Sequence, residues 1–257
     1  GELVGIVPEG VPRKRGAGMD EVGSLRDAYL TIESERISGF GNMSDCPAAS
    51  PKDEVLDAKG GMVMPTFCDS HTHICYAGTR EQEFIDKING LSYEEIAARG
   101  GGILNSADLL HRTSEEELYS QTMAHVREMI AKGTGAIEIK SGYGLTLEDE
   151  LKMLRVIRRV KKDSPATIKA TFLGAHAVGR ALKGRQNEYV NLVCEEMIPA
   201  VAAEGLAEYV DVFCDEGFFT VAETDRILSA GEAYGLIPKI HANELACSGG
   251  VQVAVKH

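Results

Sequence analysis

The stretch Val63-Met-Pro-Thr-Phe-Cys-Asp-Ser-His-Thr-His73 is an apolar, β-like run that ends in two histidines. Positions i and i+2 of a strand face the same side, so the imidazoles of His71 and His73 can point at one spot. Neutral imidazole is a good ligand for Zn²⁺ or Fe²⁺. His-X-His alone is weak evidence because it occurs often by chance. Its place at the end of an apolar run favours a metal site over two unrelated polar residues.

The chain that follows alternates short apolar runs with amphipathic segments. Few charges interrupt the apolar runs, as expected of strands covered on both faces. The predicted strands are 66–71, 135–140, 167–174, 208–214 and 237–241. The predicted helices are 114–131, 147–162, 187–204 and 221–234. Capping pairs predict three helix starts: Thr113 with Glu116, Thr146 with Asp149, and Thr220 with Glu223. Strands alternating with helices indicate parallel βα units.

Reactive residues recur where these predicted strands end. His71 ends the first, His176 follows the third and His241 ends the fifth. A (β/α)₈ TIM-type barrel places its chemistry at the C-terminal ends of its strands, so we predict this α/β fold rather than a doubly wound sheet. About five of the eight βα units are recognisable, and we therefore expect an incomplete barrel that lacks about three units.

Residues 1–63 differ from the rest because their β-like runs, 28–32 and 37–41, are not separated by helices. We predict two domains, a small all-β domain at 1–63 and the barrel at 64–257. The first residues, GELVGIVPEG, lack the basic and apolar regions of a signal peptide.

Composition narrows the possible partners. The 257 residues are 44% hydrophobic and carry a net charge of -12. An acidic protein is a poor partner for nucleic acid or an anionic membrane, and no apolar run is long enough to span a bilayer. The six cysteines are scattered without a Cys-X-X-Cys pair, which fits a reducing cytoplasm better than a disulfide framework.

Further residues could complete a site around the two histidines. His241 supplies a third imidazole, although a lone histidine after a strand is more often structural. Glu244, three residues later, could hold a metal-bound water or move its proton, or it could be a solvated loop acid. His176 could bind the metal or the substrate, or it could be a core histidine.

Two other candidates lie in loops. Tyr143 stands between two glycines that permit a tight turn, although loop tyrosines commonly serve in packing. Arg80 suits capture of a substrate carboxylate, and pairing with Glu81 or Glu83 is an equal alternative. Gly100-Gly-Gly102 lacks the Lys-Ser/Thr of a phosphate-binding loop, so we interpret it as a flexible loop.

The stretch Met64-Pro-Thr-Phe-Cys-Asp-Ser-His-Thr-His73 is similar to the first-strand signature of the amidohydrolase superfamily. Residues 1–63 resemble part of that superfamily's small composite β-sandwich domain. Within this superfamily, the chain resembles the imidazolonepropionase family. The matching stretches are Ala77-Gly-Thr-Arg-Glu81, Ala98-Arg-Gly-Gly-Gly-Ile103, Glu138-Ile-Lys-Ser-Gly-Tyr-Gly-Leu145, Phe172-Leu-Gly-Ala-His-Ala177 and Lys239-Ile-His-Ala-Asn-Glu244.

The resemblance implies hydrolysis of the cyclic amide 4-imidazolone-5-propanoate to N-formimidoyl-L-glutamate in histidine degradation. It implies one Zn²⁺ or Fe ion per subunit, a homodimer and a small-molecule substrate. The implied metal ligands are His71, His73 and His241. The implied substrate contacts are Arg80, Tyr143, His176 and Glu244, of which Glu244 is the catalytic candidate.

The chain departs from the family pattern at its end. The family's fourth ligand, an Asp, and its base, the His of an Asp-His-Leu motif, have no counterpart up to His257. The fourth predicted strand ends in Asp215-Glu216 without a bridging Lys, which by family analogy favours one metal. Alternative functions are another amidohydrolase, such as a nucleobase deaminase or a cyclic-imide hydrolase, and a non-catalytic barrel.

Overall fold

The chain folds into two units, Gly1–Thr66 and Phe67–His257. The computed structural model describes residues 1–7, 10–11, 13–92, 95–96 and 101–257. The matching stretch 98–103 and the glycine loop 100–102 therefore lie partly outside the described residues.

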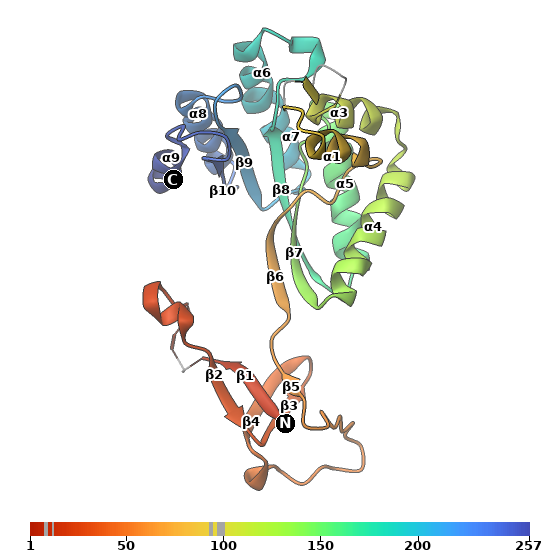
Figure 1. Cartoon of the computed structure of the whole chain (residues 1–257), viewed down its shortest axis with the longest axis vertical. Coiled ribbons are helices and arrows are strands. Elements are labelled where there is room, and N and C mark those ends of the chain that lie inside the picture. Colours follow the sequence, from red (N-terminus) through yellow and green to blue (C-terminus); the bar gives the residue numbers. More distant parts are fainter. Residues whose placement is uncertain (8–9, 12, 93–94, 97–100) are drawn as a thin grey trace. The chain divides into compact units, whose positions relative to one another are not determined.

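The first unit contains short strands in two small sheets (Figure 1). In one sheet, β1 (Glu2–Ile6) pairs antiparallel with β2 (Gly23–Arg26) and parallel with β5 (Met62–Val63). In the other, β3 (Ala28–Glu33) and β4 (Arg36–Asn42) form a hairpin. Ser34 and Glu35 have φ angles of 50° and 63°, the left-handed conformation that a tight hairpin turn requires.

The second unit is built on one parallel sheet in the order β10-β9-β8-β7-β6. Its strands are β6 (Phe67–Thr72), β7 (Thr134–Lys140), β8 (Thr167–Ala175), β9 (Tyr209–Cys214) and β10 (Ile237–Pro238). Chain order and sheet order agree, without the reversal that marks a doubly wound sheet. The prediction of an α/β fold with a barrel-type parallel sheet is confirmed.

The prediction of one continuous strand at 237–241 is wrong. The segment consists of two short strands, β10 and β11 (His241–Ala242), which pair separately with β9. Lys239 and Ile240 separate the two strands. The Lys239 N–H still donates to the Val210 carbonyl of β9 at 2.8 Å, and regular pairing resumes at His241.

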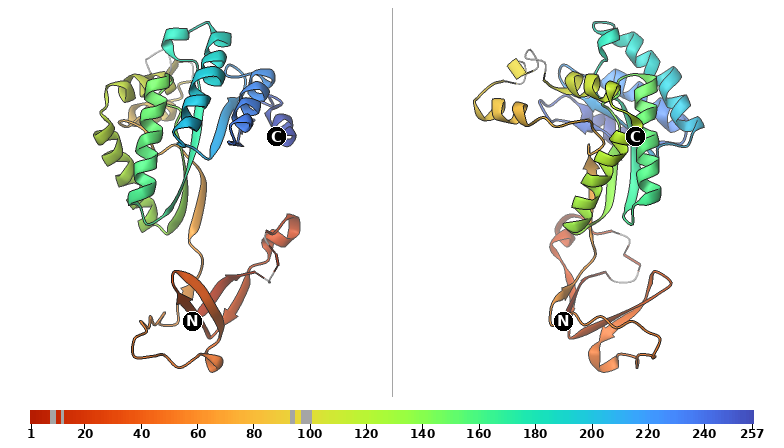
Figure 2. Two further views of the ribbon diagram at one scale, coloured as in Figure 1. Left: turned by 180° about the vertical axis from the view of Figure 1, so that it is seen from behind. Right: turned by 90° about the vertical axis from the view of Figure 1, so that its right-hand side faces the viewer.

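Helices cover one face of this sheet (Figure 2). The described helices are α1 (Glu81–Ile88), α3 (Ile103–Arg112), α4 (Glu115–Ala131), α5 (Leu147–Asp163), α6 (Gln186–Leu192), α7 (Ile198–Ala203), α8 (Val221–Ala233) and α9 (Gly250–Lys256). Of these, α4, α5 and α8 pack directly on strands β7, β8 and β9. The predicted helix 187–204 is interrupted by a π-helical turn at Val193–Met197. Pro199, which has no N–H to donate to a regular helix, lies two residues after this turn. Helices α1 and α3 were not predicted. None of the described helices is long and apolar enough to cross a membrane.

Two of the three predicted helix starts are confirmed. Thr146 caps α5 by accepting the Asp149 N–H, and Thr220 forms a reciprocal capping box with Glu223 at α8. The prediction of Thr113 as the cap of α4 is wrong. Its hydroxyl donates to the Leu109 carbonyl of the preceding helix.

Ser114 caps α4 instead, by accepting the Glu117 N–H.

The core lies between the sheet and the helices. Ile137 and Ile139 of β7 belong to it, together with buried side chains of α4 and α5 such as Val126 and Leu154. Because neighbours on a strand face opposite sides, Glu138 and Lys140 turn to the other face of the sheet. That face carries the polar groups described next.

Candidate metal centre

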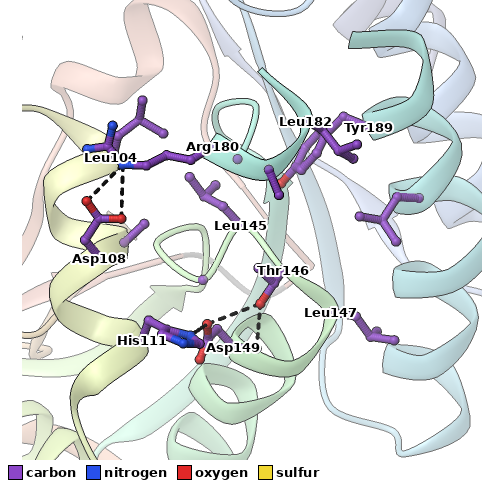
Figure 3. Close-up of a pocket in the computed structure, with 15 residues that line it drawn as sticks. Leu104, Asp108, His111, Leu145, Thr146, Leu147, Asp149, Arg180, Leu182 and Tyr189 are labelled. Atoms are coloured by element: carbon purple, nitrogen blue, oxygen red, sulfur yellow. Dashed lines mark hydrogen bonds and ion pairs between the residues drawn. The ribbon is translucent and has the colours of Figure 1, made fainter. Parts of the chain in front are cut away.

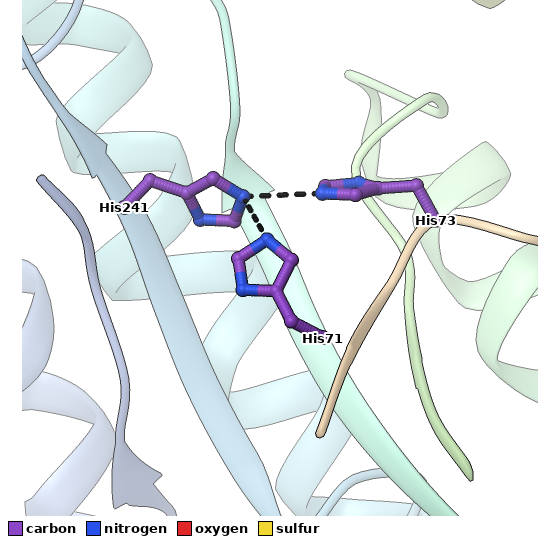
Figure 4. Close-up of side chains that lie close together, drawn as sticks. All are labelled: His71, His73 and His241. Atoms are coloured by element: carbon purple, nitrogen blue, oxygen red, sulfur yellow. Dashed lines mark hydrogen bonds between the residues drawn. The ribbon is translucent and has the colours of Figure 1, made fainter. Parts of the chain in front are cut away.

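Three imidazoles from distant parts of the chain meet at the carboxyl ends of the strands. His71 lies near the end of β6, His73 just beyond it, and His241 at the start of β11. Figure 4 shows their rings pointing at one another. The Nε2 atom of His241 is 2.9 Å from Nε2 of His71 and 3.1 Å from Nε2 of His73. One ligand atom from each of the three lies within 4.8 Å of the others.

The tautomer of His241 decides what this cluster can bind. Its Nδ1 lies 3.2 Å from Asp211 Oδ1, and a carboxylate can only accept, so Nδ1 carries the proton. The Nε2 atom of His241 therefore presents a lone pair, which cannot accept from both other rings at once. A cation shared by three lone pairs satisfies all of them. Tetrahedral Zn²⁺ with Zn–N bonds of 2.0–2.1 Å would separate its ligand nitrogens by about 3.3 Å, close to the distances observed.

Two of the rings are held in the neutral state that metal binding needs. Burial is the largest cause that lowers the pKa of His73, to about 2, and the nearby His176 adds to it. Burial, followed by the charge of Lys140, lowers the pKa of His71. The residues present thus fit a metal ion.

A buried charge network stands behind His241. Lys140 Nζ lies 2.8 Å from Asp211 Oδ2 and 2.7 Å from Glu138 Oε1, and all three side chains are buried. Although burial alone would raise it, the hydrogen bond with His241 and the charge of Lys140 hold the pKa of Asp211 well below its usual range. Asp211 therefore stays ionised and keeps His241 oriented.

Sequence reasoning did not single out Glu138, Lys140 or Asp211. The signal was present, because these residues place charges inside two runs that are otherwise apolar, and a covered strand excludes unpaired charge.

Tyr143 and His176 lie beside the three imidazoles. The ring of His176 stacks on that of His73 with 5.2 Å between centroids, and it lies 5.2 Å from the ring of Tyr143. His176 Nδ1 donates to the Gly142 carbonyl at 2.9 Å, which leaves its Nε2 as an acceptor. Burial is the main cause that lowers the pKa of His176, to about 4.

Arg80 reaches the same region from the start of α1. Its Nε donates to Glu83 Oε2 at 2.8 Å. Arg80 also interacts with Tyr143. Burial raises the pKa of that phenol, and the charge and hydrogen bond of Arg80 oppose the rise. Both interpretations of Arg80 thus have a structural counterpart, one in the pairing with Glu83 and one in the contact with a candidate site residue.

Glu244 is placed near the centre by its backbone alone. The N–H groups of Glu244 and Leu245 both donate to Asp215 Oδ2 at 2.8 Å, which fixes the loop after β11. The side chain of Glu244 is exposed, and its carboxylate makes no hydrogen bond or ion pair within the part of the chain that the structure describes. Among the described residues, no hydrogen bond or ion pair links this carboxylate to the three imidazoles.

A separate cavity of about 200 Å³ is lined in part by Gly144 and Leu145, which follow Tyr143 in the chain (Figure 3). Its lining includes Leu145 and Tyr189, with the ion pairs Arg180–Asp108 and His111–Asp149 at its edge. None of the predicted site residues lines it. The candidate site is therefore the imidazole cluster and not this cavity.

The sequence aligns with curated relatives over its whole length. It is 52% identical to the imidazolonepropionase of Flavobacterium psychrophilum and 51% identical to that of Christiangramia forsetii, with 100% of this chain aligned in both cases. It is 43% identical to the imidazolonepropionase of Symbiobacterium thermophilum. The chain is a homologue of imidazolonepropionases. It spans 62% of the length of the first two relatives and 60% of the third. No protein-family model matches it.

Solved structures with a similar fold come from a deaminase. The 5-methylcytosine deaminase of Klebsiella pneumoniae, liganded with 5-fluorocytosine, matches 99% of this chain with a TM-score of 0.59 and 13% identity. The match covers 55% of the deaminase chain. The same enzyme liganded with phosphonocytosine gives a TM-score of 0.56. At this identity the likeness concerns the fold alone.

Proposed function

We propose that this chain carries the metal centre and substrate contacts of an imidazolonepropionase. The proposed reaction is hydrolysis of 4-imidazolone-5-propanoate to N-formimidoyl-L-glutamate. The observation that carries the proposal is the convergence of His71, His73 and His241, in a chain 52% identical to a curated imidazolonepropionase. Water adds to the ring carbonyl carbon, the adjacent C–N bond breaks, and the released nitrogen takes a proton.

One Zn²⁺ or Fe ion per subunit would be held by the three Nε2 atoms. Such an ion lowers the pKa of bound water toward about 7 and polarises the carbonyl under attack. Asp211 keeps the Nδ1 proton on His241, so that its Nε2 stays available as a ligand.

The other site residues bind and orient the substrate. Arg80 would pair with the propionate carboxylate, for which a guanidinium is well suited. Tyr143 would contact the ring, and the neutral His176 would accept a hydrogen bond from a ring N–H through Nε2. Glu244 is the candidate for moving the proton of the attacking water, because it lies on an exposed loop three residues beyond His241.

The remaining assignments follow from this function. We propose a cytoplasmic homodimer that acts on a small molecule and binds neither nucleic acid nor membrane. The domains are the β-sandwich part at 1–63 and the barrel at 64–257. All six cysteines are free thiols, which supports a reducing compartment.

The deciding experiment measures turnover of the imidazolone by the full-length protein and by Arg80→Ala. Loss of a charge-assisted hydrogen bond costs about 1.5–3 kcal/mol, so kcat/KM should fall roughly 10- to 100-fold. Arg226→Ala is the matched control, because Arg226 is an exposed arginine paired with Glu195 at 3.1 Å, and it should leave turnover unchanged.

Unchanged turnover in Arg80→Ala would favour a substrate without a carboxylate, such as a nucleobase. Elemental analysis of the same preparations addresses the non-catalytic alternative. A protein purified without stoichiometric metal, and unable to take it up, contradicts the metal-dependent reaction.

A further inference from the structure

Glu150 is a buried carboxylate that binds the main chain of the Tyr143 loop. Its side chain is fully buried in the first turn of α5. Oε1 accepts the N–H of Gly144 at 2.8 Å and that of Leu145 at 3.0 Å, and Oε2 accepts the N–H of Gly142 at 3.1 Å. Three main-chain N–H groups thus bind one buried carboxyl group, in the way that a main-chain loop binds an anion, and the bound group is the Glu150 side chain.

The loop 141–145 needs this support. Gly142 has a φ of 109°, and Leu145 has a φ of 56°, which is unfavourable for a branched side chain. At Gly144 a Cβ atom would lie 2.4 Å from the Glu150 nitrogen, so only glycine permits the close approach. In this conformation the N–H groups of Gly142, Gly144 and Leu145 all point at Glu150, which accepts all three.

Two candidate substrate contacts depend on the loop. Tyr143 lies between two residues whose N–H groups Glu150 binds. The carbonyl of Gly142 accepts the Nδ1 proton of His176, which fixes that ring with its Nε2 lone pair free for substrate. A shift of the loop would therefore move the phenol of Tyr143. It would also remove the carbonyl that fixes the tautomer of His176.

We propose that Glu150 is a positioning residue for substrate binding. It holds the loop that sets the place of Tyr143 and the tautomer of His176, and it touches neither the metal ligands nor the substrate. The roles of these two residues toward substrate rest on the proposed function.

The test compares Glu150→Gln with Asp149→Asn in the full-length protein. Glutamine keeps the size of Glu150 but turns an NH₂ toward main-chain N–H groups in place of an acceptor. Asp149 is the adjacent residue on the same turn, and its carboxylate binds His111, Lys152 and the Thr146 hydroxyl instead of the main chain of the loop. Both changes replace a carboxyl group by an amide at the same helix end.

We expect KM for the imidazolone to rise at least tenfold in Glu150→Gln while the bound metal stays stoichiometric. The ¹⁵N spectrum of His176 should change from a single Nδ1–H tautomer to a mixture. Asp149→Asn should match the parent protein in both measurements. Equal KM and equal His176 spectra in the two variants would overturn the proposal, and so would loss of metal from Glu150→Gln.

A measurement on the parent protein avoids any folding defect of the variant. The amide protons of Gly142, Gly144 and Leu145 should be shifted downfield and protected from exchange with solvent. Rapid exchange at these amides would also overturn the proposal. Neither the amide exchange nor the His176 spectrum requires turnover, so failure of the parent to hydrolyse the imidazolone would count against the proposed function alone.

Discussion

At the scale of single residues, Asp211 links the metal centre to the interior of the sheet. Its Oδ1 and Oδ2 lie 3.2 and 3.1 Å from His241 Nδ1, and Oδ2 also lies 2.8 Å from Lys140 Nζ. A partner of this kind fixes both the orientation and the tautomer of a ligand, and its loss typically lowers metal affinity 10- to 100-fold.

We therefore expect Asp211→Asn to weaken metal binding by about that factor, because the amide keeps the shape but not the charge. Titration of the metal-free protein against a chelator of known affinity measures the change. Asp108→Asn is the control, since Asp108 pairs with Arg180 at the surface. Equal affinity in the two variants would show that Asp211 has no part in holding His241.

At the scale of elements, periodicity and start signals predicted most of the second unit. Strands β6 to β9 and helices α5 and α8 lie within a few residues of their predicted positions. The misses have local causes. A threonine and a serine compete at the start of α4, and the last predicted strand is interrupted at Lys239 and Ile240.

The paths of loops and the pairing of distant strands limited what could be predicted for the site from the sequence. The three metal-ligand candidates were found from strand ends and spacing, and the structure brings them together. Glu150 was not found, because its role depends on the path of loop 141–145, which no period in the sequence encodes. Likewise the pairing of Lys140 with Asp211 joins residues 71 positions apart.

The corrected start of α4 makes a prediction at this scale. Ser114→Ala should lower the free energy of unfolding by about 1 kcal/mol, because the Glu117 N–H loses its acceptor. Ser114→Gly should cost only a few tenths of a kcal/mol, since glycine is an acceptable cap. Urea denaturation of both variants measures the difference. Equal losses in the two would contradict Ser114 as the cap.

At the scale of the whole molecule, buried neutral imidazole makes stability depend on pH. The pKa of His176 is about 4 in the folded chain against 6.5 for an ordinary histidine. As the pH falls below 6.5, the unfolded chain takes up a proton that the folded chain refuses. The contribution is therefore fully present above pH 6.5 and is lost as the pH falls toward 4.

At pH 5 this difference amounts to roughly 2 kcal/mol, from about 1.5 pH units at 1.36 kcal/mol each. We expect His176→Gln to reduce, without abolishing, the dependence of the unfolding free energy on pH between 7 and 5 in the metal-free protein, because the pKa values of His71 and His73 are lowered too. Urea denaturation at the two pH values measures the slope. An unchanged slope would mean that other groups cause the acid sensitivity.

The meeting of His71 with His241 joins residues that are 170 positions apart and belong to opposite margins of the sheet. An ion held there would link β6 to β11 through their histidines, and its size would affect the distance between these two strands. The radius of the ion would then influence the curvature of the sheet. A larger ion would hold β6 and β11 further apart than a smaller one, and both strands would carry that displacement to the groups that line them.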